Sequence, residues 1–143
     1  MHEPDPVVYL TEDLVVQIAT LNLTQNGQGA AEVRDYGLLS SAVNRPRSVS
    51  FGVTHYPGLF DKAAALLQSL ARNHAFVDGN KRAAWNSAAA FLEVNGAHLL
   101  EPLDEDRAEK FVLAVVSGEL ADVEAIAGVL ATFHDPPAGE PGC

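Results

Sequence analysis

One short stretch holds most of the polar groups in this chain that could do chemistry together: His74-Ala75-Phe76-Val77-Asp78-Gly79-Asn80-Lys81-Arg82. It runs directly into an alanine-rich segment, residues 83–96, whose apolar side chains recur at helical spacing. A histidine, a carboxylate, a glycine turn, an amide and two cations therefore stand where a helix is expected to begin.

A helix that begins at this point favours the binding of phosphate. Its first amide N–H groups lack partners within the helix, and the aligned peptide dipoles leave partial positive charge at that end. Gly79 lets the backbone come close to a ligand, and Asn80 can donate from its side-chain amide. Lys81 adds a point charge, while Arg82 adds a planar group that can hold two phosphate oxygens. This set of groups fits a polyphosphate.

Two further residues of the stretch suggest a reaction at that phosphate. Asp78 offers a hard oxygen ligand of the kind that Mg²⁺ takes together with waters and phosphate oxygens. His74 can accept a proton from a hydroxyl group at neutral pH. We therefore interpret the stretch as a site for phosphoryl or nucleotidyl transfer, with His74 as the general base and Asp78 as the metal ligand.

Each of these residues also has a purely structural interpretation. A lone histidine at a helix end is more often structural, and Asp78 could be the N-cap of the helix that follows. Lys81 and Arg82 could be ordinary solvated residues, but cations at a helix N-terminus oppose the dipole, which favours an anionic ligand. Asn86 shares a face with Arg82 at i,i+4 spacing, and it could instead bond within the core.

The stretch resembles the active-site motif of the Fic/Doc family, His-x-Phe-x-(Asp/Glu)-Gly-Asn-(Gly/Lys)-Arg, and it is most similar to the Doc branch, in which Lys follows Asn. The resemblance covers roughly residues 7 to 130 and includes an Asn at position 86. The other segments that look like Doc sequence are Tyr9-Leu10-Thr11, Arg34-Asp35-Tyr36-Gly37-Leu38-Leu39, Arg45-Pro46, Tyr56-Pro57, Phe60-Asp61-Lys62-Ala63-Ala64-Ala65-Leu66-Leu67 and Ser117-Gly118-Glu119-Leu120.

The resemblance implies an all-α, compact Fic/Doc-like bundle and a growth-arresting toxin that uses ATP and Mg²⁺. Doc proteins transfer the γ-phosphate of ATP to a threonine of translation elongation factor Tu, which stops translation. In this chain His74 would be the base, Asp78 would hold Mg²⁺, and the phosphate-binding residues would be Gly79, Asn80, Lys81, Arg82 and Asn86.

The family also suggests how the protein would be controlled. The chain contains no Ser/Thr-x-x-x-Glu-(Gly/Asn) inhibitory motif of the kind that self-inhibited Fic proteins carry. Inhibition is therefore expected from a separate chain, a Phd-type antitoxin whose C-terminal segment is disordered when free and folds on the toxin.

Two alternatives remain open at this point. The first is AMP transfer, as in Fic enzymes, where a Gly replaces Lys81 and a second Arg stands at the position of Trp85. The second is a helical domain that binds a partner and catalyses nothing, with the motif kept for folding. Consumption of ATP would separate this last possibility from the other two.

Composition limits the class of protein. A chain of 143 residues with 48% hydrophobic residues fits one domain with its own core. The formal charge of −10 argues against direct nucleic acid binding, which needs a basic surface. A single cysteine, Cys143, cannot form an internal disulfide, and no signal peptide or membrane-spanning apolar run is visible. We expect a cytoplasmic protein that binds no membrane.

Periodicity and turn residues predict about six helices and one short hairpin. Residues 1–8 are expected to be flexible, residues 9–134 to form the domain, and residues 135–143 to be a disordered tail. The hairpin is expected over 48–56, and the family resemblance implies that it is a flap beside the active site, where His55 could contact substrate. Trp85 is expected to pack in the core. The predicted helices begin at the caps Thr11, Asp35 and Asp104, at Pro57, after the motif, and at Ala121.

Overall fold

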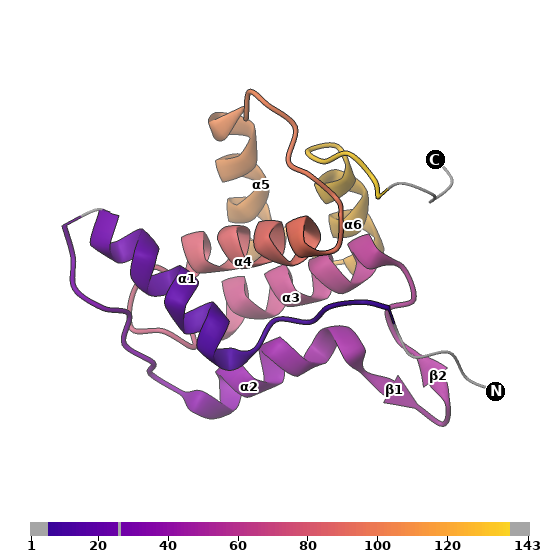
Figure 1. Cartoon of the computed structure of the whole chain (residues 1–143), viewed down its shortest axis with the longest axis horizontal. Helices are drawn as coiled ribbons and strands as arrows, with labels where there is room; N and C mark the ends of the chain where they lie inside the picture. Colours follow the sequence, from indigo (N-terminus) through magenta and orange to yellow (C-terminus); the bar gives the residue numbers. More distant parts are fainter. Residues whose placement is uncertain (1–5, 26, 138–143) are drawn as a thin grey trace.

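The fold is the predicted all-α bundle. The computed structural model describes residues 6–25 and 27–137. Within them six α-helices surround one core, and the only sheet is a two-stranded antiparallel hairpin (Figure 1). The elements are α1 (Glu12–Gln25), α2 (Tyr36–Asn44), the 3₁₀ helix η1 (Arg45–Arg47), β1 (Val49–Ser50), β2 (Val53–Thr54), α3 (Leu59–Asn73), α4 (Asn80–Val94), α5 (Glu105–Ser117) and α6 (Val123–Ala131).

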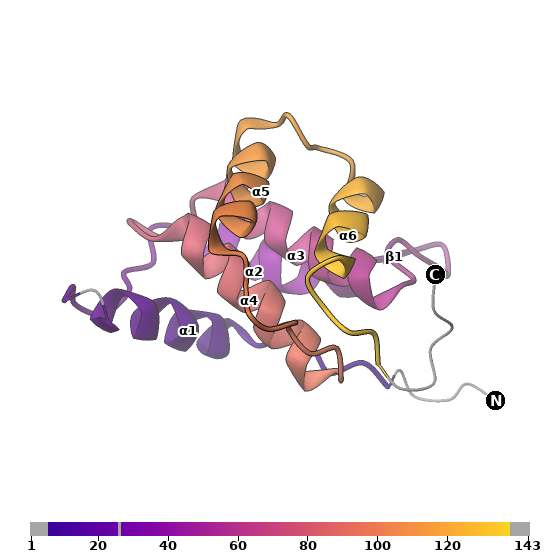
Figure 2. The ribbon, with the colours of Figure 1, turned by 90° about the horizontal axis from the view of Figure 1, so that it is seen from above.

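Helix α3 is the centre of the bundle. It packs against α2, η1, α4, α5 and α6, and it lies beside α4 in both views (Figures 1 and 2). Ten of its 15 residues are buried, which is possible because alanines and leucines occupy almost every side of the helix. Since residues 74–79 join α3 to α4, the motif is the turn of a helical hairpin whose two arms are fixed by packing.

Aspartate caps begin three of the helices. The side chains of Asp35, Asp104 and Asp122 accept hydrogen bonds from the backbone N–H groups of Leu38, Arg107 and Ala125. Each bond supplies a partner to an N–H group that the helix itself leaves unbonded. The caps expected at Asp35 and Asp104 are thus confirmed, whereas the last helix begins at Val123 rather than at Ala121.

The buried face of α1 differs from the face that its sequence indicates. Leu14 and Leu21, which lie at helical spacing with Ile18, are exposed, and the buried residues are Val15, Ala19 and Leu23. Both sets recur at helical spacing, so periodicity alone could not choose between them. The choice depends on α4, against which α1 packs.

The hairpin of β1 and β2 forms as predicted but not beside the motif. Lys62 Nζ donates to Tyr56 O at 2.7 Å, and Arg45 Nε donates to the Tyr56 hydroxyl at 2.9 Å, so the hairpin is anchored near the N-terminal end of α3. His74 follows the opposite end of that helix, which at 15 residues is about 22 Å long. The expectation of a flap next to His74, which the family resemblance implies, is therefore not met by this hairpin. His55 bonds to Ser50 of the same hairpin.

The chain segments at the edge of the domain are held by specific contacts. Val8 exchanges two hydrogen bonds of 2.8 Å with the Asn95 side chain at the end of α4, and Asp135 N donates to His98 O. The expectations of flexibility for residues 1–5 and of disorder for residues 138–143 lie outside the described residues. None of the helices in the described part of the chain has the length and apolar character needed to cross a membrane.

Burial of His134 predicts a pH dependence of stability. Burial lowers the pKa of His134 below its usual value, although its hydrogen bond to Leu130 O and the nearby charge of Glu93 act in the opposite direction. The folded state therefore keeps this histidine neutral while the unfolded chain protonates near pH 6.5. The contribution is complete above about pH 6.5 and is lost as the pH falls towards the lower, folded-state pKa.

We expect the free energy of unfolding, measured in urea, to fall between about pH 7.5 and about pH 5.5, and His134→Gln to reduce this fall. Glutamine stays neutral and can still donate to Leu130 O. His55→Gln, at an exposed histidine, is the control and should leave the slope unchanged. An equal slope in the native chain and in His134→Gln would contradict the assignment.

Candidate functional site

The loop that carries the motif begins with a left-handed residue. His74 ends α3 with φ 53° and ψ 50°, a conformation that turns the chain out of the helix and that is uncommon for residues other than glycine. Its side chain is exposed to solvent. The imidazole therefore stands outside the core at the point where α3 stops, directly before the turn to α4.

Arg34 holds this end of α3. Its Nε donates to His74 O at 2.7 Å and its Nη2 donates to Asn73 O at 3.2 Å. These are carbonyls that the end of the helix leaves without partners, and the guanidinium also offsets the negative end of the helix dipole. The contact fixes the backbone of the proposed base from a residue 40 positions earlier in the chain.

The segment that contains Arg34 also pairs with the motif loop. Val33 and Phe76 form an antiparallel β-bridge, Arg34 N and Asp35 N both donate to Ala75 O, and Val77 N donates to Glu32 O. Residues 32–35, rather than the hairpin at 48–56, are thus the extended segment that lies along the motif.

Phe76 and Asn80 close the turn from inside. Phe76 is buried, with only 1% of its surface exposed, and its backbone N–H and C=O bond to Oδ1 and Nδ2 of the Asn80 side chain at 3.0 and 2.9 Å. The amide of Asn80 therefore fastens the start of α4 to the loop that precedes it. The sequence analysis expects the Asn80 side-chain amide to donate to a ligand. In the structure this amide bonds to the backbone of Phe76 instead.

Asp78 and Gly79 lead into α4. Asp78 is exposed, and its Oδ1 accepts from Gly79 N at 2.8 Å, so Oδ2 remains available to a ligand. Gly79 has φ 78°, and a Cβ there would lie 3.3 Å from Leu23 Cδ2 of α1. The position therefore favours glycine for both its backbone geometry and its small size.

The start of α4 presents donors without a side-chain cap. Gly79 supplies no capping hydrogen bond, and the first helical bond runs from Ala83 N to Gly79 O. By helix geometry the N–H groups of residues 80–82 precede the first acceptor in the helix. Lys81 and Arg82 are exposed at the same end, and neither forms an ion pair with a carboxylate within the described ranges.

A cavity of about 510 Å³ opens beside this helix start. It brings together three of the predicted phosphate-binding residues, Lys81, Arg82 and Asn86, but not His74, Asp78, Gly79 or Asn80, which lie on the loop and at the first residue of the helix. Its other lining residues come from α4, α1 and the α5 side: Trp85, Asn22, Leu103, Glu105, Ala108, Glu109, Val112 and Leu113.

Sequence reasoning gave no role to several residues that shape this region. In the sequence Arg34 stands out only as part of a segment that resembles the family. No local signal reveals its bond to His74, because the tertiary fold brings the two residues together. Glu105 and Glu109 lie one helical turn apart on α5, which could have indicated a shared face but not the cavity that they line.

The described residues contain no cluster of three or more His, Cys, Asp or Glu that could hold a metal ion by themselves. Any divalent cation at this loop would therefore need most of its ligands from elsewhere.

Comparison with known proteins agrees with the geometry. The model of the Fic/DOC family matches residues 9–92, a range that includes the motif loop and the Arg34 segment paired with it. The chain belongs to the Fic/Doc family.

Two curated relatives place the chain within this family. It is 55% identical over 105 residues to "Toxin Doc" of Mycolicibacterium smegmatis, a match that covers 73% of this chain and 80% of that protein. It is 26% identical over 126 residues to "Protein kinase doc" of Escherichia phage P1, covering 88% of this chain and 95% of the relative. The resemblance to the Doc branch seen in the sequence is thus confirmed.

Gly79→Ala tests the fit of the motif turn against α1. An alanine at positive φ costs about 1–2 kcal/mol, and here its Cβ would also press on Leu23. The matched control is Gly27→Ala, since Gly27 has the same φ of 78° and nothing within 4 Å of its added Cβ. In urea denaturation we expect Gly79→Ala to lower the free energy of unfolding more than Gly27→Ala does. Equal losses would show that Leu23 moves aside for the added methyl group at no cost in stability.

Arg34→Gln tests the anchoring of His74. Loss of the guanidinium removes two hydrogen bonds to exposed carbonyls, so we expect about 1 kcal/mol of destabilisation and a change in the backbone chemical shifts of His74 and Ala75 by NMR. Arg34→Lys, which keeps the charge but not the two-pronged geometry, should give an intermediate result. Unchanged shifts at His74 in Arg34→Gln would show that the loop holds its shape without the arginine.

Proposed function

We propose that this protein is a Doc-like toxin that transfers the γ-phosphate of ATP to a serine or threonine hydroxyl of a protein, with elongation factor Tu as the expected target. The observation that carries the proposal is the motif loop, in which an exposed histidine, an exposed carboxylate and an uncapped helix start with two free cations follow one another within nine residues. The names of the two relatives, a toxin and a protein kinase, support it.

Each residue takes a role that its surroundings permit. His74, exposed and with its backbone held by Arg34, would accept the proton of the attacking hydroxyl. The backbone N–H groups at the start of α4, together with Lys81 and Arg82, would bind the phosphates. Asn80 would contribute mainly through its backbone N–H, because its side chain bonds to Phe76.

Mg²⁺ would bind through Asp78, whose Oδ2 has no partner in the described part of the chain. When bound, the ion neutralises phosphate charge and stabilises the charge that develops during phosphoryl transfer. With one protein carboxylate available, the residues fit a metal that arrives with its nucleotide rather than a metal site filled in advance.

Lys81 and Trp85 favour phosphate transfer over AMP transfer. The AMP-transferring branch has a glycine and a second arginine at these positions, and both would help to hold the outer phosphates. Here the Trp85 ring packs against Phe133 and Phe111, with centroids 5.1 and 6.3 Å away, so this position supplies aromatic packing and no cation. The attacking oxygen must approach the phosphorus to roughly 3–3.5 Å in line with the leaving group. A different position of the phosphates in the site therefore changes which phosphorus is attacked and which group is transferred.

A toxin of this kind requires an inhibitor, and we propose a Phd-type antitoxin as the partner. The cavity beside α4 has Lys81 and Arg82 on one wall and Glu105 and Glu109 from α5 among its lining residues. A folded antitoxin segment that carries both charge signs would complement these walls, and basic residues on it would be favoured by the net charge of −10.

Incubation with labelled ATP and a bacterial lysate tests the reaction. We expect label from γ-labelled ATP on one protein of the size of elongation factor Tu, no label from α-labelled ATP, and ADP as the second product. His74→Ala should reduce transfer by about a hundredfold to ten-thousandfold while Mg-nucleotide binding persists, because only the proton acceptor is lost. Asp78→Ala should weaken the Mg²⁺-dependent part of nucleotide binding as well.

The controls separate the alternatives. His55→Ala, at an exposed histidine on the distant hairpin, should transfer as the native chain does. Label only from α-labelled ATP, with release of pyrophosphate, would show AMP transfer instead. Growth arrest that persists in both His74→Ala and Asp78→Ala would reject the enzyme and favour a domain that acts only by binding.

A further inference from the structure

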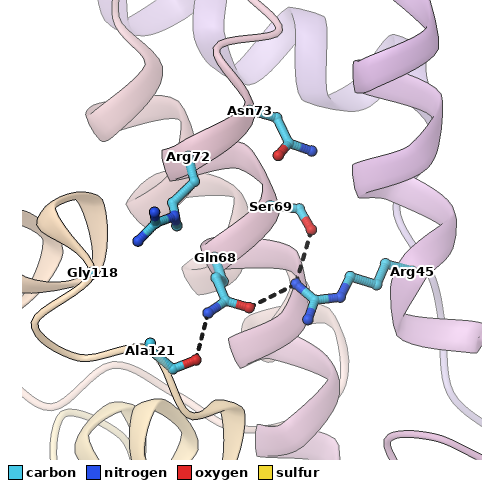
Figure 3. Close-up of a pocket in the computed structure, with 7 residues that line it drawn as sticks. All are labelled: Arg45, Gln68, Ser69, Arg72, Asn73, Gly118 and Ala121. Atoms are coloured by element: carbon cyan, nitrogen blue, oxygen red, sulfur yellow. Dashed lines mark hydrogen bonds between the residues drawn. The ribbon is translucent and has the colours of Figure 1, made fainter.

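A second cavity lies outside the motif, on the last two turns of α3. It has a volume of about 440 Å³ (Figure 3). Gln68, Ser69, Arg72 and Asn73 form one wall from α3. The remaining lining residues are Arg45 from η1 and, from the turn between α5 and α6, Gly118 and Ala121. No role in the proposed transfer reaction falls to any of these seven residues.

The lining is rich in donors and lacks carboxylates. Among the described residues, the seven that line this cavity include two arginines and no aspartate or glutamate, in a chain with 19 acidic residues. Neither arginine forms an ion pair within the described ranges. Figure 3 shows the Arg45 and Arg72 side chains on opposite sides of the cavity, with Gln68 and Ser69 between them.

Hydrogen bonds within the protein use only some of the N–H groups of the Arg45 and Arg72 side chains. Arg45 donates through Nε to the Tyr56 hydroxyl and through Nη1 to Gln68 Oε1, Ser69 Oγ and Ala65 O. Arg72 donates through Nη1 to Val115 O. In the described part of the chain, Nη2 of both residues and Nε of Arg72 have no acceptor, so each arginine keeps N–H groups for a ligand.

Neighbouring polar groups add further donors. Ser69 is 7% exposed and accepts from Arg45, which leaves its own hydroxyl hydrogen to donate. The half-buried side chain of Asn73 lines the same cavity and has no partner within the described residues. The Gln68 amide, by contrast, is already engaged with Arg45 and with Ala121 O, so it braces the cavity and does not supply a new donor.

These groups select the class of ligand. Donors from two arginines, a hydroxyl and an amide exceed what the two oxygens of a carboxylate can accept, but they suit the three terminal oxygens of a phosphate monoester. Arg72, whose Nε and Nη2 are both open, can hold phosphate in planar, two-pronged geometry, and Arg45 adds a donor through Nη2. A nearly dianionic group also gains more from two cations than a carboxylate does. Because no acidic residue lines the cavity, a bound phosphate meets no carboxylate at close range there, although the net charge of the chain is −10.

We propose that this cavity, which we name the Arg45–Arg72 site, binds a phosphate monoester. The ligand could be a small phosphorylated metabolite or a phosphorylated side chain of a protein, since both present the same group. The site is separate from the motif and does not depend on the transfer reaction proposed above.

The test is an NMR titration of the isotope-labelled full chain with inorganic phosphate and with O-phosphoserine. We expect saturable shifts at the Arg72 Nε–H signal and at the backbone amides of Gly118 and Ala121. Arg72→Gln should weaken the affinity by roughly tenfold or more, because it removes a charged donor. At Arg45 we use Arg45→Lys, because it keeps the positive charge near the hairpin if Arg45→Gln does not fold. Arg45→Lys should also weaken the phosphate affinity, since lysine lacks the planar geometry of arginine.

The matched control is Arg47→Gln, which removes the same charge from an exposed neighbour outside the cavity, stacked on Tyr9. It should give the same phosphate titration as the native chain at the backbone amides of Gly118 and Ala121. Unchanged affinity in both Arg72→Gln and Arg45→Lys, or an equal loss in Arg47→Gln, would overturn the proposal. Acetate that binds as tightly as phosphate would overturn the ligand class.

The source of the phosphate is found with a phosphoserine peptide. Binding of the peptide that is tighter than that of O-phosphoserine supports a protein ligand, and equal or weaker binding supports a small metabolite. Unphosphorylated peptide should not bind; if it binds as tightly as the phosphopeptide, the phosphate is not what the cavity recognises and the proposal fails.

Discussion

The burial of α3 on almost every side is the constraint from which the rest of the structure follows. A helix whose alanines and leucines face five neighbouring elements cannot shift along its axis without disturbing all of them. Its C-terminal end is therefore a fixed point, and His74, which must turn the chain away from it, has a defined position although its side chain is in solvent. The surrounding contacts refine this position: Arg34 binds the carbonyls at the helix end, and Asn80 binds the backbone of Phe76.

The site thus combines a firmly held loop backbone with side chains that are exposed to solvent. Main-chain and side-chain hydrogen bonds from residues 32–35 hold the backbone of residues 73–77. The imidazole of His74 and the carboxylate of Asp78 are exposed to solvent. The proposed catalytic groups are therefore open to a substrate, whereas Phe76 and the Asn80 side chain, which support the loop, are buried or half-buried. The same division applies to Asn80, whose side chain supports the loop and whose backbone N–H, at the first residue of α4, precedes the first acceptor in the helix.

The sequence predicts the parts of this fold whose causes are local. Asp35 and Asp104 are recognised as caps because a cap acts within four residues, and the motif is recognised because its polar groups are consecutive. The sequence does not determine the buried face of α1, because Leu14 and Val15 both begin a helical stripe and only the packing partner selects one of them. The location of the hairpin, the bond from Arg34 to His74 and the engagement of Asn80 depend on contacts between distant segments, for which neither spacing nor propensity gives a signal.

The pairing of residues 32–35 with the motif loop also bears on how the chain folds. The bond from Arg34 to His74 joins residues 40 positions apart, so the loop between them must close before the motif takes its final shape. All of that loop, including α2 and α3, precedes α5 and α6 in the chain. During synthesis on a ribosome, every residue that bonds to the motif turn has therefore been made once α4 has emerged, whereas the cavity beside α4 must wait for α5. A nascent chain would hold all the bonding partners of its proposed base before it acquired the cavity next to it, and the packing of α5 and α6 would then fix α3 in place.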